Sequence, residues 1–285
     1  LSGSSALMVK QSMESLSGRL FEYYLPPLRF GEYLEMCGKK PERIVEPFKA
    51  KKRYADELER FFINGSFPEI CRMGPGVARG YIRKSTVEKI VFEDIPMTFN
   101  IEHPSKLHDL AILCATNSSN LFSEVNFAEA LQMSRHAVSD YLFYLGQAYL
   151  IGIIYPIGSF QKALRKQKKM FLKSASLYNA LAENPTIGQA AETAVYDKLN
   201  GMGQLAFYRD PQKREVDFIQ KIPIEVKYQS TIISEDMRTL LYYMQTHGNK
   251  KGILITKDVF DEKTVDGKTI LLIPLDVFLL MEKMP

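Results

Sequence analysis

The predicted fold is decided by the stretch Arg214-Glu215-Val216-Asp217-Phe218-Ile219-Gln220-Lys221-Ile222-Pro223-Ile224-Glu225-Val226-Lys227-Tyr228. Apolar and charged residues alternate along it, which is typical of β-strands with one buried face. Two short strands joined by a tight connection account for the pattern. Glu225 and Lys227 are two residues apart, so their side chains leave the same face of their strand.

The length of the connection decides whether Asp217 joins these two side chains. With a two-residue loop at 220–221, the carboxylates of Asp217 and Glu225 point to opposite faces. With a three-residue loop at 220–222, Asp217 pairs with Glu225 and all three charged groups share one face. Pro223 at the loop edge is compatible with the longer loop, because proline donates no hydrogen bond to a ladder. The sequence leaves both registers open.

Neighbouring carboxylates repel each other unless a cation lies between them. Mg²⁺ commonly binds one or two protein carboxylates together with waters and substrate phosphate oxygens. Asp217 and Glu225 are therefore candidate metal ligands, and Lys227 is a candidate for orienting the attacking water or offsetting phosphoryl charge. An exposed hairpin with alternating charges explains the same pattern without any catalytic role.

The residues before the hairpin favour the catalytic interpretation. Residues 188–199 have helical spacing with one apolar stripe, and Glu192 lies beside that stripe. A strand is predicted at 205–209. The order of helix with Glu, strand, strand with Asp and strand with Glu-x-Lys resembles the core of the PD-(D/E)XK nucleases. This resemblance implies a mixed α/β sheet, Mg²⁺ as cofactor, and the catalytic residues Glu192, Asp217, Glu225 and Lys227.

Composition limits the class of protein. The chain has 285 residues, 46% of them hydrophobic, which is enough for two or three compact domains. The net charge of +4 means that any nucleic-acid surface must come from local clustering of cations. The three cysteines are widely spaced, which predicts no disulfide framework or zinc site and fits a reducing cytoplasm. Residues 141–158 lack charged side chains but contain glycine, glutamine and proline, so we expect a soluble protein without a membrane span.

A second informative block spans residues 106–176. A short helix at 122–131, a turn at 132–134 and a longer helix at 135–148 have helix-turn-helix spacing. Two strands around a basic loop follow, which predicts a winged helix. No Asp or Glu occurs from residue 141 to 182, and clustered cations without carboxylates indicate a phosphate-binding surface. The predicted DNA contacts are Arg135, His136, Lys162, Arg165, Lys166, Lys168 and Lys169. The alternative is a winged helix that makes only protein contacts, with a solvated basic loop.

The N-terminal part of the chain carries a further resemblance. The runs Ser2-Gly3-Ser4-Ser5, Leu16-Ser17-Gly18-Arg19, Pro27-Leu28-Arg29-Phe30-Gly31-Glu32-Tyr33-Leu34 and Gly65-Ser66-Phe67-Pro68-Glu69 are similar to an archaeal and bacterial family of AAA-type P-loop ATPases. In that family the ATPase is fused to a C-terminal region of unknown function. The resemblance implies that Ser4 or Ser5 senses the γ-phosphate of the nucleotide and that Arg19 faces the phosphates.

The P-loop itself is missing. The only Gly-Lys-Thr, at 267–269, has Glu262 where the motif requires glycine, and Asp266-Gly267 is better explained as a hairpin turn. We therefore expect a truncated chain, with ATP bound only by the intact protein and with homo-oligomers formed through the ATPase part.

These observations predict a multidomain chain. It comprises an ATPase remnant (1–52), a helical linker (53–105), a winged helix-turn-helix domain (106–176) and a PD-(D/E)XK nuclease-like α/β domain with a mixed sheet (177–285). The predicted function is that of the C-terminal part of a P-loop ATPase that acts on DNA, with Mg²⁺-dependent phosphodiester cleavage. The alternative is a catalytically inactive nuclease fold that serves as the DNA- or protein-binding part of an ATP-switched regulator.

Overall fold

The computed structural model describes residues 25–158 and 167–284. Several predicted site residues lie outside these ranges: Ser4, Ser5, Arg19, Lys162, Arg165 and Lys166. None of the helices within the two described ranges is long and apolar enough to cross a membrane.

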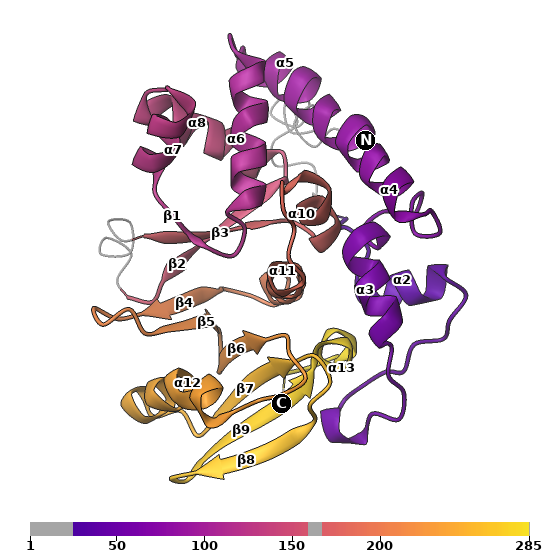
Figure 1. The fold of residues 1–285 in the computed structure, drawn as a ribbon, viewed down its shortest axis with the longest axis vertical. Coiled ribbons are helices and arrows are strands. Elements are labelled where there is room, and N and C mark those ends of the chain that lie inside the picture. The colour runs from indigo at the N-terminus through magenta and orange to yellow at the C-terminus, as the bar shows by residue number, and fades with distance from the viewer. Residues whose placement is uncertain (1–24, 159–166, 285) are drawn as a thin grey trace, which may run out of the picture.

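One nine-stranded sheet runs through the described structure in the order β1-β3-β2-β4-β5-β6-β7-β9-β8 (Figure 1). Its strands are β1 (Leu121–Phe122), β2 (Ile151–Pro156), β3 (Lys168–Leu172), β4 (Ala206–Arg209), β5 (Glu215–Ile219), β6 (Pro223–Lys227), β7 (Lys251–Thr256), β8 (Asp261–Val265) and β9 (Lys268–Pro274). The parallel pairing of β2 with β4 joins the strands on either side of residue 177. Strands from the predicted winged-helix and nuclease-like segments therefore belong to one sheet.

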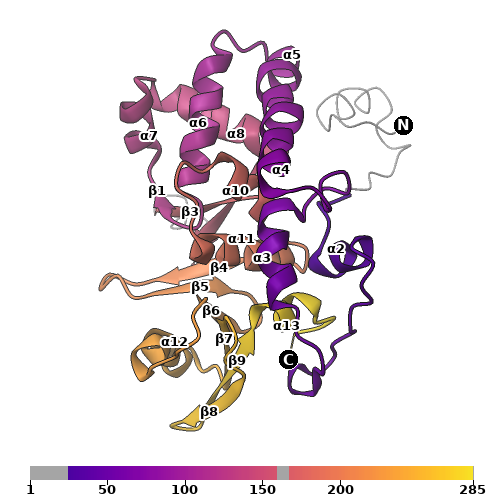
Figure 2. The ribbon, with the colours of Figure 1, turned by 45° about the vertical axis from the view of Figure 1, so that its right-hand side comes forward.

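Helices surround this sheet (Figure 2). They are α2 (Phe30–Met36), η1 (Pro47–Lys49), α3 (Ala55–Asn64), α4 (Pro75–Tyr81), the π-helical segments η2 (Ile82–Glu88) and η3 (Ile90–Asp94), α5 (Ile95–Phe99), α6 (Pro104–Thr116), α7 (Glu124–Leu131), α8 (Arg135–Gln147), α10 (Ala175–Leu181), α11 (Ile187–Asn200), α12 (Ser234–His247) and α13 (Leu275–Leu280). The segment from α4 to α5 forms one long helical rod (Figure 1). α12 packs on strands β5, β6, β7 and β9, and α11 contacts β3 and β6.

The hairpin of β5 and β6 has the longer of the two predicted loops. Phe218 pairs with Ile224 and Ile219 pairs with Pro223, which leaves three residues, 220–222, in the connection. The same register continued by one pair sets Asp217 opposite Glu225, as the three-residue alternative predicts.

The hairpin turn predicted at Asp266 and Gly267 is also confirmed. Val265 pairs with Lys268, so these two residues form the whole loop between β8 and β9. Both have positive φ angles, 49° and 70°, as a type I′ turn requires.

A β-bulge lies at Asp217. The pairing of β4 with β5 slips by one residue between Ala206 and Tyr208, so that Phe207 alone lies opposite both Asp217 and Phe218. Bulges bend a strand and redirect its side chains, and they are common beside functional sites. This bulge was not predicted, because it depends on the pairing partner rather than on local sequence.

The predicted helix at 188–199 corresponds to α11, whereas α10 was not predicted. Nearly every residue of α10 is buried, so it lacks the polar face that reveals a surface helix in a sequence. It contacts α3, α6, α11 and β3, and it therefore packs against all three predicted segments from residue 53 onward.

Candidate functional site

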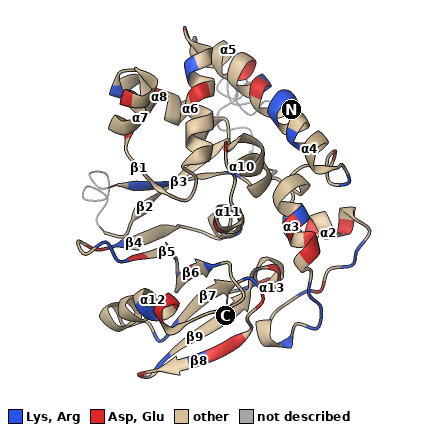
Figure 3. Ribbon diagram, in the orientation of Figure 1, with Lys and Arg blue, Asp and Glu red and all other residues tan. Residues whose placement is uncertain are grey.

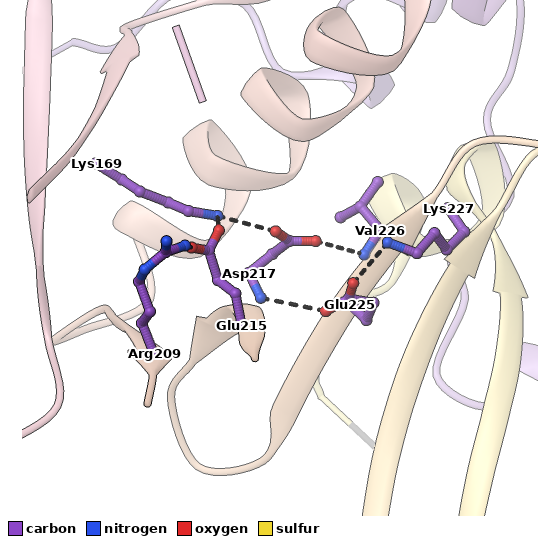
Figure 4. A network of polar contacts seen from close by, with 7 residues as sticks. All are labelled: Lys169, Arg209, Glu215, Asp217, Glu225, Val226 and Lys227. Atoms are coloured by element: carbon purple, nitrogen blue, oxygen red, sulfur yellow. Dashed lines mark hydrogen bonds and ion pairs between the residues drawn. The ribbon is translucent and has the colours of Figure 1, made fainter. Parts of the chain in front are cut away.

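Asp217 and Glu225 lie at the point where β5 and β6 stop pairing (Figure 4). The Val226 N–H donates to Asp217 Oδ2 over 3.0 Å, and the Asp217 N–H donates to Glu225 Oε2 over 3.3 Å. Each carboxylate thus binds the backbone of the opposite strand. These two side-chain hydrogen bonds therefore link β5 to β6 beyond their last paired residues, Phe218 and Ile224.

Two lysines neutralise the remaining carboxylate oxygens. Lys227 Nζ donates to Glu225 Oε1 over 2.7 Å. Lys169 Nζ, from β3, lies 2.9 Å from Asp217 Oδ1 and 2.7 Å from Glu215 Oε1. All four carboxylate oxygens of Asp217 and Glu225 therefore accept a hydrogen bond from this chain. We call Glu192, Glu215, Asp217, Glu225, Lys169 and Lys227 the charged cluster.

Glu192 joins the cluster from α11. It is partly buried, and its carboxyl accepts a hydrogen bond from the Ser119 side chain. Its charge interacts with those of Asp217, Lys169 and Glu225. The structure thus brings together all four residues that the sequence predicts as catalytic, and it adds Lys169 and Glu215.

The protonation states of the carboxyl groups differ. Burial, and then the charge of Asp217, raises the pKa of Glu225 to about 8. The same two causes raise the pKa of Glu192 to about 8. Burial alone would raise the pKa of Asp217, but Lys169 and Lys227 outweigh it and hold this pKa below its ordinary value. At neutral pH Asp217 is therefore charged, whereas Glu192 and Glu225 hold their protons to a higher pH than ordinary glutamates do.

Raising the pH is expected to destabilise the protein through Glu225. Its pKa rises on folding from 4.5 to about 8, so its contribution is complete below pH 4.5 and is lost as the pH rises towards 8. One proton changes the free energy of unfolding by at most about 1.4 kcal/mol per pH unit. Glu225→Gln keeps the neutral shape and should give a shallower fall in stability, measured by urea denaturation across this range. The exposed Glu235→Gln should keep the wild-type profile. An identical profile for Glu225→Gln would contradict the assignment.

The prediction that Lys169 contacts DNA is wrong. Only 1% of Lys169 is exposed, and its ammonium points into the charged cluster. Burial alone would lower the pKa of Lys169, but Asp217 and Glu215 outweigh it and raise this pKa. β3 begins at Lys168, so Lys168 and Lys169 are successive strand residues whose side chains leave opposite faces. This alternation is the signal that could have placed Lys169 inside.

The other predicted DNA contacts within the described ranges are nearer the surface. Lys168 Nζ lies 2.9 Å from Glu124 Oε1, and Arg135 Nε lies 3.3 Å from Glu124 Oε2. The side chains of Arg135 and His136 are 70% and 90% exposed, respectively. His136 Nε2 lies 3.7 Å from Asp140 Oδ2. Glu124, at the start of α7, therefore holds two of the predicted phosphate contacts.

The cluster in this arrangement does not fit a divalent ion. Its carboxylates are the donor type that Mg²⁺ prefers. However, the Lys169 and Lys227 ammonium groups lie 2.9 Å from Asp217 Oδ1 and 2.7 Å from Glu225 Oε1, and they would repel a divalent ion beside the same oxygens. Across residues 25–158 and 167–284, no group of three or more His, Cys, Asp and Glu side chains is arranged to hold a metal ion.

Comparison with known proteins divides the chain into two parts. Residues 55–187 match the domain of unknown function DUF8612, and residues 187–277 match the domain of unknown function DUF4143. The latter is an AAA-ATPase-associated domain family. Lys169 lies in the first matched region and Asp217 in the second, so the charged cluster combines residues from both matched regions.

Two curated relatives come from the archaeon Methanocaldococcus jannaschii. The chain is 24% identical to uncharacterized protein MJ1544, over 93% of this chain and 64% of the relative. It is 26% identical to uncharacterized protein MJ1637, over 98% of this chain and 64% of the relative. The chain thus spans somewhat less than two thirds of the length of these relatives. No solved structure matches it.

Proposed function

We propose that this chain is the DNA-binding part of a longer ATPase-type protein. In this proposal α7, α8, β2 and β3 form a winged helix that contacts the duplex. The nuclease-like α/β region supports it without cleaving DNA. The observation that carries the proposal is the exposed first turn of α8, where Arg135 and His136 follow the N-cap Ser134. In helix-turn-helix proteins this turn of the second helix meets the major groove.

The surrounding charges support a phosphate-binding role. β3 begins with two basic residues (Figure 3), of which Lys169 points into the charged cluster. Lys168 approaches Arg135 through their shared partner Glu124. Lysine and arginine side chains near phosphates release counterions, so the affinity should fall linearly with salt on a logarithmic scale.

Fluorescence anisotropy with a labelled DNA duplex at several salt concentrations tests the proposal. Arg135→Ala should weaken binding and reduce the magnitude of the salt slope by about 0.9, the value for one phosphate contact. Arg238→Ala on α12 removes an equally exposed arginine and serves as the control. An affinity that does not depend on salt, or an equal loss in both variants, would exclude DNA binding through α8.

Glu124→Gln is expected to increase DNA affinity by several fold. Lys168 and Arg135 both lower the pKa of Glu124, against the opposing effect of burial, so this carboxylate is charged at neutral pH. Removing the charge frees both cations for phosphate and removes a repulsive group. The same anisotropy titration measures the gain, with Glu235→Gln as an exposed control far along the chain. Weaker binding by Glu124→Gln would show that Glu124 instead holds the surface in its binding shape.

Mg²⁺-dependent DNA cleavage is the second candidate function. It is favoured by the convergence of Glu192, Asp217, Glu225 and Lys227 in one cluster. This reaction would require the Lys169 ammonium to leave Asp217. Plasmid nicking with Mg²⁺ or Mn²⁺ tests it, with Asp217→Ala and Lys227→Ala prepared identically. Cleavage by the wild type that both substitutions abolish would establish the enzyme, and equal signals in all three proteins would exclude it.

A further inference from the structure

We propose that Lys169 is the resident cation of the charged cluster, and that its ammonium keeps a divalent ion from binding between the carboxylates. This inference does not depend on DNA binding. It concerns what neutralises the buried acids, and it predicts that a metal site is latent in this chain.

The Lys169 ammonium is enclosed by two carboxylates and an aromatic ring. Its side chain is 2% exposed, and Nζ lies within 3 Å of Asp217 Oδ1 and Glu215 Oε1. The ring of Phe207 lies on another side, with its centroid 5.7 Å from Nζ. A buried ammonium is retained only where carboxylates and further polar contacts offset its loss of water. The Lys169 ammonium is therefore held at one buried position by its ion pairs and is not a mobile surface charge.

A divalent ion in the charged cluster would compete with the Lys169 ammonium for the same carboxylate oxygens. A divalent ion bound to Asp217 Oδ1 would lie next to an ammonium that bonds the same oxygen. The other Asp217 oxygen accepts the Val226 N–H, and the Glu225 oxygens accept Lys227 and the Asp217 N–H. Without movement of the backbone, only departure of Lys169 frees an oxygen on both Asp217 and Glu215.

Lys169 belongs to a strand that lies far from Asp217 both in the chain and in the sheet. Lys169 reaches Asp217 from β3, which is 48 residues earlier in the chain and is separated from β5 by β2 and β4 in the sheet. Arg209 Nη1 lies 2.7 Å from Glu215 Oε2 and holds the second carboxylate that Lys169 contacts (Figure 4). The cation is therefore supplied by the part of the chain that precedes the nuclease-like segment.

Mn²⁺ titration followed by electron paramagnetic resonance tests the inference. Lys169→Met removes the charge with little change in side-chain length. The variant should gain a Mn²⁺ site at least tenfold tighter than any site in the wild type, and Lys169→Met/Asp217→Asn should lose it. Lys198→Met is the matched control. Lys198 is partly buried, and it donates to the carbonyl oxygens of Leu279 and Met281 rather than to carboxylates. This variant should gain no site.

The wild-type protein gives a result even if Lys169→Met fails to fold. Its Lys169 ammonium should be protected from solvent exchange in ¹⁵N-resolved NMR spectra, and added Mg²⁺ should leave the signal unchanged. Two results would overturn the inference. One is a wild-type Mn²⁺ site that Asp217→Asn abolishes. The other is a folded Lys169→Met protein that binds Mn²⁺ no better than the wild type.

Discussion

Replacing Asp217 by alanine is expected to lower the free energy of unfolding by about 3–5 kcal/mol, the range for breaking a buried ion pair by removing one partner. The substitution removes one of the two carboxylates that pair with the buried Lys169 and leaves it with Glu215. It also removes the acceptor of the Val226 N–H at the point where β5 and β6 separate. The Lys169 ammonium and the Val226 N–H thus each lose a hydrogen-bond acceptor in the protein interior.

Urea denaturation measures this effect, and Glu235→Ala is the control. Glu235 forms an ion pair with Arg238 on the exposed surface of α12. Loss of an exposed pair one helical turn apart costs less than about 0.5 kcal/mol. If Asp217→Ala were no more destabilising than the control, the charged cluster would not hold the sheet together.

Asp276→Ala is expected to cost about 2–4 kcal/mol, since it removes the shared partner of a buried donor and a guanidinium. Asp276 is 1% exposed and lies in the first turn of α13. Its carboxylate accepts the Tyr54 N–H over 2.7 Å and Arg53 Nε over 2.9 and 3.0 Å. These bonds tie the segment before α3 to the last helix.

Asp276→Asn separates the two contributions. The amide oxygen can still accept from Tyr54, but the ion pair with Arg53 is lost. The asparagine variant should therefore lie between wild type and Asp276→Ala in urea denaturation. Cleavage of the segment just before α3 by a protease should follow the same order. Equal stability of all three proteins would show that this connection is not stabilising.

The local elements of residues 177–285 could be predicted because their signals are local. Strand alternation predicts β5 and β6, and the Asp266-Gly267 pair predicts the β8–β9 turn. The register of β5 and β6 could not be chosen, because loops of two and three residues both suit the sequence. The choice depends on which backbone groups pair, and the structure pairs Phe218 with Ile224.

The contribution of Lys169 was missed for a different reason. A run of lysines after a polar loop has the composition of a phosphate-binding surface. The parallel pairing of β2 with β4 places β3 in the same sheet as β5, and the Lys169 ammonium is buried there among acids. Strand alternation could have placed Lys169 inside, but its contact with acids much later in the chain is long-range and leaves no local pattern. Glu215 was missed likewise, because its role depends on Lys169 and Arg209.

Anomalous diffraction from crystals soaked in Mn²⁺ shows whether Lys169 excludes a metal from the charged cluster, because it locates the ion and the lysine in one experiment. We predict no manganese peak beside Asp217 in the wild-type protein, with Lys169 Nζ remaining in hydrogen-bonding contact with Asp217 and Glu215. A manganese peak bound to Asp217, with the Lys169 side chain displaced from the cluster, would contradict this prediction.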